Sequence, residues 1–235
     1  MRLQAAFCSI KIKDIRKGTD MTDLSKIKAG GILRTTVLLI LGVLYLALVA
    51  AMFIFNIDLA ADKTMQAVLH ITVILSAFAY LFFVDMIYGT ETDKGNGRLA
   101  LILAALFTVP ILIGRGIGIA VISFNELFAV DSIFNFYAAV SITRTIELIS
   151  WTTFFPLSML FLAKLFFKKG KKTLCLAWLC LFSSICCFIA FMSIISTNMI
   201  YLFIGVTGWG ILFSLIIIVY LSAQIRKIKD NRAGS

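Results

Sequence analysis

The stretch ILRTTVLLILGVLYLALVAAMFIFNI, residues 32–57, decides the fold because it is long and apolar enough to cross a membrane. The hydrocarbon core of a bilayer is about 30 Å thick, and a helix that rises about 1.5 Å per residue needs about 20 apolar residues to cross it. A helix also satisfies its backbone hydrogen bonds within one segment, which a water-free bilayer core demands. These residues therefore predict a transmembrane helix.

Similar stretches recur along the chain, and together they predict an all-α membrane protein, a bundle of six transmembrane helices. The composition agrees, because 61% of the residues are hydrophobic and only 14% are charged, whereas apolar residues make up about half of a soluble domain. Residues 1–31 are expected to form an N-terminal arm and residues 224–235 a basic tail around one membrane domain, residues 32–223. After the first span, the predicted spans are about residues 65–88, 99–124, 143–167, 173–196 and 199–223.

Basic residues gather on one side of the predicted membrane. Residues 1–34 contain eight Lys and Arg against three acids, and residues 164–172 contain five lysines, whereas the turns at 58–64 and 124–133 contain four acids and one lysine. Since Lys and Arg concentrate in cytoplasmic loops, both termini are predicted to be cytoplasmic, and an even number of spans agrees. The expected location is a cell membrane, namely the cytoplasmic membrane of a bacterium.

The first 20 residues are too polar for a signal peptide and contain no small-residue cleavage site. Two alternatives stay open: a short cytoplasmic arm, or translation that begins at Met21. The net charge of +10 follows from short basic segments beside the spans, so nucleic acid is not expected as a partner. The expected partners are membrane lipids and either a second copy of the chain or another membrane protein.

Charged residues inside apolar spans are costly and need a partner or water. In ITRTIELISW, residues 142–151, Arg144 and Glu147 lie on one helix face near the outer end of the fourth span, where they are expected to pair. Arg115 lies about 25 Å along the third span, and His70 lies in the first turns of the second span. These counts along the helices place all four side chains in one outer layer.

Two interpretations of this layer stay open. In the first, it is an outward-opening pocket for an anionic or zwitterionic ligand: Arg115 and Arg144 attract the anion, Glu147 is the counter-charge or a proton acceptor, and His70 is a titratable member. In the second, the arginines extend to the interface and Glu147 only neutralises Arg144.

Asp85, at the cytoplasmic end of the second span, is a hypothetical relay residue for protons or cations. About 15 residues of helix, roughly 22 Å, separate it from His70, so the two share a path only through water. The alternative is a local ion pair with a lysine such as Lys164 or Lys168.

Small and ring-bearing residues predict local features of the packing. The spacing of Gly114 and Gly118 permits close helix contact, and Pro110 and Pro156 are expected to kink the third and fourth spans. The sixth span contains three glycines that leave room for neighbours, Gly205, Gly208 and Gly210. The tryptophans are expected at lipid-facing and interfacial positions or in helix packing: Trp151, Trp178 and Trp209.

No cofactor or metal is expected. The sequence contains one histidine and lacks HExxH, GxSxG and nucleotide-binding loops, which argues against the commonest hydrolytic and redox membrane enzymes. The cysteines fit no zinc or disulfide spacing and are interpreted as small packing residues: Cys8, Cys175, Cys180, Cys186 and Cys187.

Several stretches carry a resemblance to a known group. The resemblance extends over most of residues 27–228. It rests on the start KAGGILRTTVLLILGVLYL, the internal RTIE, the end LSAQIRK of the last span, and the second and third spans joined by a short cytoplasmic loop. In these features the chain resembles a broad group of small bacterial six-helix membrane proteins of unknown function. The resemblance implies the six-helix layout and no activity.

Three functions are consistent with the sequence. The first is a non-enzymatic accessory, sensory or immunity-type component that acts through helix packing. The second is a small transporter or channel that uses the outer polar layer. The third, a lipid-modifying enzyme with Glu147 or His70 as base, lacks an accompanying nucleophile or metal set.

Overall fold

A computed structural model describes residues 21–54, 62–90, 94–123, 141–196 and 199–233 of the chain. Every regular element within these ranges is helical, and six helical stretches are long and apolar enough to cross a membrane. The all-α class and the number of candidate spans are thereby confirmed. The elements are α2 (Met21–Ile54), α3 (Lys63–Thr90), α4 (Lys94–Ser123), α5 (Ile142–Ile149), η1 (Ser150–Phe154), α6 (Phe155–Lys168), η2 (Lys171–Thr173), α7 (Leu174–Ala190), α8 (Met192–Ile195), α9 (Met199–Val206), η3 (Thr207–Leu212) and α10 (Phe213–Ala233).

The helices extend beyond several predicted span limits. Helix α2 begins at Met21, inside the residues expected to form the arm, and α10 continues to Ala233 through most of the predicted tail. The fourth candidate span, Ile142–Lys168, joins α5, η1 and α6, and the sixth, Ile200–Arg226, joins α9, η3 and α10.

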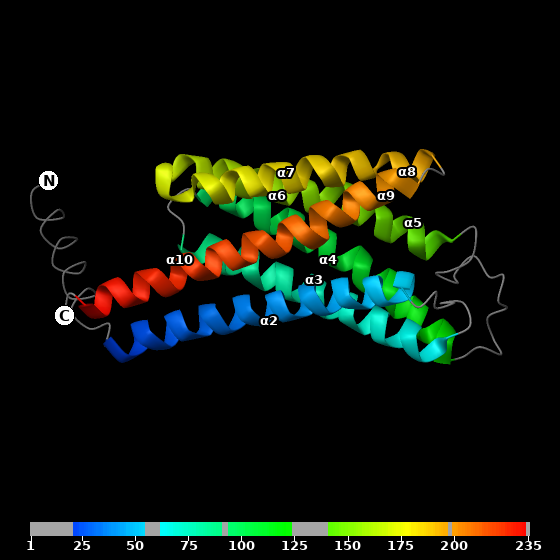
Figure 1. Cartoon of the computed structure of the whole chain (residues 1–235), viewed down its shortest axis with the longest axis horizontal. Helices are drawn as coiled ribbons and strands as arrows, with labels where there is room; N and C mark the ends of the chain where they lie inside the picture. Colours follow the sequence, from blue (N-terminus) through cyan, green and yellow to red (C-terminus); the bar gives the residue numbers. More distant parts are fainter. Residues whose placement is uncertain (1–20, 55–61, 91–93, 124–140, 197–198, 234–235) are drawn as a thin grey trace, which may run out of the picture.

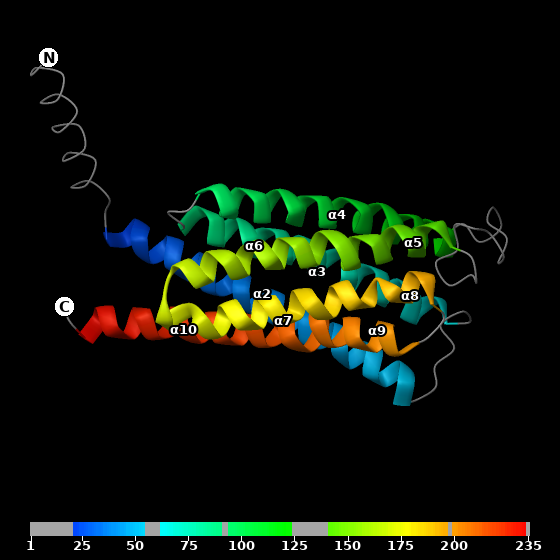
Figure 2. The ribbon, with the colours of Figure 1, turned by 90° about the horizontal axis from the view of Figure 1, so that it is seen from above.

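The candidate spans form a closed ring. Each span packs against the next along the chain, from α2 through α3, α4, α6 and α7, and α10 returns to contact α2. The beginning of α2 and the end of α10 lie at one end of the bundle, whereas α5, α8 and α9 lie at the other (Figures 1 and 2). We call the second end the α5 end.

Both the exterior of the bundle and most of its core are apolar. Large apolar side chains such as Leu33, Ile71 and Phe182 are about half exposed or more on the outside of the ring. Buried positions also include many polar residues: Thr35, Gln66, His70, Thr72, Asn96, Thr108, Arg115, Ser141, Thr143, Glu147, Ser150, Thr152, Ser158, Ser183 and Ser184. A contiguous apolar exterior of this extent fits a lipid environment.

Two candidate spans contain a π-helical segment. Segment η1 ends at Phe154, two residues before Pro156, which has no N–H for the helical ladder, and the N–H of Phe155 donates to Ser150 O, five residues back. Segment η3 has the sequence TGWGIL, in which Gly208 and Gly210 are weak helix formers, and Phe213 N–H donates to Gly208 O. Helix α4, in contrast, continues through Pro110 as an α-helix.

Neighbouring serines on α7 connect the two irregular spans. Ser184 Oγ donates to Pro156 O at 2.8 Å, and Ser183 Oγ donates to Gly208 O at 2.8 Å. Gly208 makes the second approach feasible, because a Cβ at this position would lie 2.9 Å from the Ser183 carbonyl oxygen. Helix α7 thus bonds to η3 at Gly208 and to the first turn of α6, directly after η1, at Pro156.

Candidate functional site

Three of the four predicted site residues meet inside the bundle near the α5 end. Arg115 of α4 faces Glu147 of α5 with two parallel contacts, Nε to Oε2 at 2.5 Å and Nη2 to Oε1 at 2.5 Å. The remaining terminal nitrogen of the guanidinium, Nη1, lies 3.1 Å from Nδ1 of His70 on α3. All three residues are buried, with exposed fractions of 1–5%.

The chemistry of each group defines the direction of these hydrogen bonds. A guanidinium carries only donors, so Nδ1 of His70 accepts from Arg115 and the ring proton resides on Nε2. Glu147 Oε1 also accepts a hydrogen bond from Trp151 Nε1 at 3.2 Å, one helical turn further along. Arg115 and Glu147 compensate each other's charge, which a buried charge requires, while His70 supports the guanidinium from the opposite side.

Glycines on α4 allow the close approach of the helices on either side. A Cβ at Gly118 would lie 2.6 Å from the His70 ring, and a Cβ at Gly114 would lie 3.1 Å from the Thr143 carbonyl oxygen. The close contact predicted from the spacing of Gly114 and Gly118 is confirmed. Gly118 leaves the space that the imidazole occupies beside Arg115.

Arg144 has a different position from the one that the sequence predicts. Its side chain is exposed, and its backbone N–H donates to the Ser141 side chain that caps α5. The ion pair of Glu147 is formed with Arg115, not with Arg144 as predicted from their separation of three residues. The physical reason is burial: Arg115 is inside the protein and needs the carboxylate, whereas water can solvate the exposed Arg144.

A cavity of about 140 Å³, the outer cavity, borders the ion pair. Arg115, Arg144 and Glu147 all line it, whereas His70 lies behind Arg115 and does not. The predicted pocket residues are thus divided into three that face the cavity and one that supports a facing residue. The other lining residues are Tyr45, Leu148, Trp151, Thr152, Ala190, Ser193, Leu202, Gly205 and Trp209.

Aromatic rings close the deep side of the outer cavity. The ring centroids of Trp151 and Trp209 are 4.6 Å apart, and Tyr45 lies 4.6 Å from Trp209. Trp151 belongs to η1 and Trp209 to η3, so each π-helical segment supplies one ring. Such segments occur frequently at functional sites.

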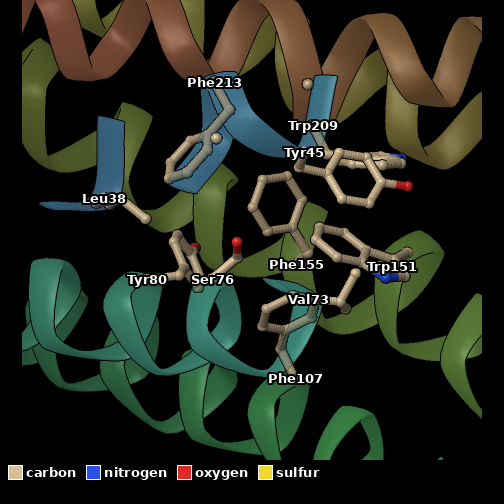
Figure 3. A pocket seen from close by; sticks show the side chains of 12 residues that line it. Leu38, Tyr45, Val73, Ser76, Tyr80, Phe107, Trp151, Phe155, Trp209 and Phe213 are labelled. Carbon is tan, nitrogen blue, oxygen red and sulfur yellow. The ribbon is translucent and has the colours of Figure 1, made fainter. Parts of the chain in front are cut away.

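The same three rings also border a second, inner cavity of about 40 Å³. Figure 3 shows Trp151, Tyr45 and Trp209 together on one side of it. Its other walls are mainly apolar, and the hydroxyls of Ser76 and Tyr80 already donate to Thr72 O and Ser158 Oγ. The rings therefore separate a polar compartment from an apolar one.

Trp151 and Trp209 are site residues that were not predicted from the sequence. Trp178 alone lies on the exterior, with 46% of its surface exposed, while the other two line both cavities. One signal was present in the sequence, because Trp151 follows Glu147 by four residues and so lies on the same helix face.

Asp85 lies far along α3 from His70 and is exposed, and it lines neither cavity. Its role as a relay stays a prediction. Within the described ranges, no group of three or more His, Cys, Asp or Glu side chains has a metal-binding arrangement. Cys8 lies outside the described residues, Cys180 and Cys187 are buried free thiols, and Cys187 lies beside Gly208 of η3.

The chain matches no protein-family model, no curated protein and no solved structure. The site is therefore interpreted from its own geometry.

Proposed function

We propose that this chain is a multi-pass protein of a bacterial cytoplasmic membrane that binds a small organic anion or zwitterion in the outer cavity and transports it. The α5 end then faces outward, and both termini lie in the cytoplasm. The observation that supports this most strongly is the combination of a compensated arginine, an additional arginine and an aromatic wall around one cavity. Helix packing alone, as in an accessory component, does not account for that combination.

The charge balance of the cavity favours a ligand with a negative group. Arg115 and Glu147 neutralise each other, which leaves the positive charge of Arg144 as the net charge of the lining. A carboxylate beside Arg144 completes the balance. The hydroxyls of Thr152 and Ser193 also line the wall, and their protons are donated to Leu148 O and Ala190 O. If the ligand is a zwitterion, its cationic group can lie next to the carboxylate of Glu147.

The size and floor of the cavity favour a compact, partly apolar ligand. A volume of about 140 Å³ is close to the roughly 150 Å³ of a protein cavity that accommodates benzene. Trp151 and Trp209 offer ring faces to an apolar or aromatic part of the ligand. We therefore use benzoate as the first probe, with acetate and phenylalanine as smaller and zwitterionic comparisons.

Transport requires that the aromatic wall open. The rings of Tyr45, Trp151 and Trp209 separate the two cavities, so the inward path of a bound solute passes between them. Both tryptophans are carried by π-helical segments. Ser183 of α7 bonds to one of these segments at Gly208, and Ser184 bonds to Pro156, which follows the other. Movement of these segments relative to α7 is the simplest route from the outer to the inner cavity.

Thermal unfolding of the purified full chain in detergent tests the binding step. A ligand that binds only the folded protein raises its unfolding temperature by mass action, so millimolar benzoate is expected to stabilise the wild type. Arg144→Gln is expected to abolish this shift, whereas Arg98→Gln, an identical charge change at an exposed residue of α4 outside the cavity, is expected to retain it. Equal responses of the two variants, or no response of the wild type to any of the three probes, would refute the proposal.

Uptake of radiolabelled benzoate into liposomes that contain the protein tests the transport step. Accumulation that depends on Arg144 supports a transporter. Binding without accumulation would contradict transport and would favour a ligand-sensing component.

A further inference from the structure

A groove on the exterior of the bundle lies at the opposite end from the outer cavity. It has a volume of about 530 Å³, within the roughly 300–1,000 Å³ that small-molecule sites occupy. Helix α6 supplies most of its walls and α7 supplies Leu181. The residues that line it are Leu160, Phe161, Ala163, Lys164, Phe167, Lys168 and Leu181.

The groove is polar at one end and apolar along its length. Lys164 and Lys168 are exposed and one helical turn apart on α6, and Lys168 is the last residue of that helix. Leu160 lies eight residues before Lys168, about 12 Å deeper along the helix, and its side chain is 39% exposed. Ala163 is buried at 1% exposure, and its small side chain leaves the hollow open.

Charge and shape together match one class of occupant. We infer that this groove is a binding site for an anionic phospholipid, with the headgroup phosphate beside Lys164 and Lys168 and an acyl chain along Leu160, Phe161 and Leu181. Basic pockets between membrane helices on the cytoplasmic side are a recurrent form of lipid recognition. The site is independent of the outer cavity, with which it shares no lining residue.

Neighbouring lysines allow lipid binding in the groove to be distinguished from general attraction to negative lipids. Lys171 and Lys172 are exposed in η2, immediately after α6, but they do not line the groove. Nonspecific attraction of a lipid depends only on the total positive charge, whereas binding in the groove depends on the two lysines at its polar end. The double variants Lys164→Gln/Lys168→Gln and Lys171→Gln/Lys172→Gln remove the same charge and differ only in position.

Native mass spectrometry of the full chain measures the bound lipid. Phosphatidylglycerol and phosphatidylcholine with identical acyl chains are added to the detergent-purified protein, and bound lipid is counted for the wild type and both double variants. We expect the wild type and Lys171→Gln/Lys172→Gln to retain phosphatidylglycerol in preference to phosphatidylcholine. In Lys164→Gln/Lys168→Gln, the affinity for phosphatidylglycerol is expected to fall roughly 10- to 30-fold.

Two results would overturn the inference. Equal losses in the two double variants would show general electrostatic attraction, and equal binding of the two lipids by the wild type would show that no headgroup site exists. The thermal unfolding profile of each variant without added lipid serves as the control for folding. All four lysines are exposed, so their replacement by glutamine is expected to leave that profile unchanged.

Discussion

Two buried polar clusters connect the same helices, but one cluster is charged and the other is neutral. Near the α5 end, the cluster of His70, Arg115 and Glu147 is ionic and borders the outer cavity. Deeper in the bundle, Tyr80 donates to Ser158 Oγ at 2.7 Å, and Ser158 donates to the Ala100 carbonyl oxygen at 2.9 Å, so the second cluster is neutral. Both connect α3, α4 and the fourth candidate span.

The difference shows how location determines which polar groups are tolerated. The ring of Tyr80 contacts those of Phe107, Phe155 and Phe213, with centroids 5.1–5.5 Å apart, and a full charge in that aromatic surround lacks both water and a counter-charge. Beside the cavity, a charge has space and a partner. Full charges inside the bundle are therefore expected to serve the cavity, and neutral hydroxyls to serve packing.

The largest loss of stability is expected when the ionic cluster is broken. Arg115→Ala leaves the Glu147 carboxylate buried without its counter-charge, which costs about 3–5 kcal/mol in protein interiors. The free energy of unfolding in detergent, measured by denaturant titration, should fall by about that amount. Arg98→Ala on the same helix, exposed at the surface, is the control. A loss as small as that of the control would contradict a buried ion pair.

A smaller loss is expected from crowding the same cluster. Gly118→Ala places a methyl group 2.6 Å from the His70 ring, and overpacking of this kind costs about 1–3 kcal/mol. Gly116→Ala, two residues earlier, meets no atom within 4 Å and should be neutral or slightly stabilising. The two alanine variants differ only in what the new methyl contacts, so equal stabilities would show that His70 does not occupy this space.

The neutral cluster is expected to respond more weakly. Tyr80→Phe removes the hydroxyl that donates to Ser158 but leaves Ser158 bonded to Ala100 O, so the loss should be about 1 kcal/mol. A loss equal to that of Arg115→Ala would abolish the distinction between the two clusters. The same denaturant titration measures it.

The smallest effect on stability is expected for Arg144→Gln, because the side chain is exposed. Its unfolding free energy should match that of the wild type, while the stabilisation by benzoate is lost. A variant that unfolds far more easily without ligand would indicate that Arg144 supports the fold and not the ligand.

The sequence predicted the features that depend on length and depth along a helix. Apolar length predicted the six candidate spans, and residue counts brought His70, Arg115 and Glu147 to one level. Those counts do not define the rotation of a helix about its axis, and rotation decides that Glu147 is buried against Arg115 while Arg144 stays exposed at the cavity.

The aromatic wall depends on interactions that the sequence does not display. Trp209 lies in the π-helical segment η3, and Ser183 of the neighbouring helix α7 donates to the carbonyl oxygen of Gly208 in that segment. Trp151 reaches it from a second such segment before Pro156. Neither segment has a hydrophobic period that distinguishes it from the α-helix on either side.

A double-mutant cycle tests the central claim, that Arg115 and Glu147 form a buried ion pair beside the cavity. Arg115→Met, Glu147→Met and the double variant are unfolded in detergent, and their free energies of unfolding are compared with that of the wild type. Each single variant leaves one buried charge, whereas the double variant leaves none. If the ion pair is buried, the double variant is expected to be more stable than the sum of the single losses implies, by about 2–3 kcal/mol. Additive losses, within about 0.5 kcal/mol, would contradict it.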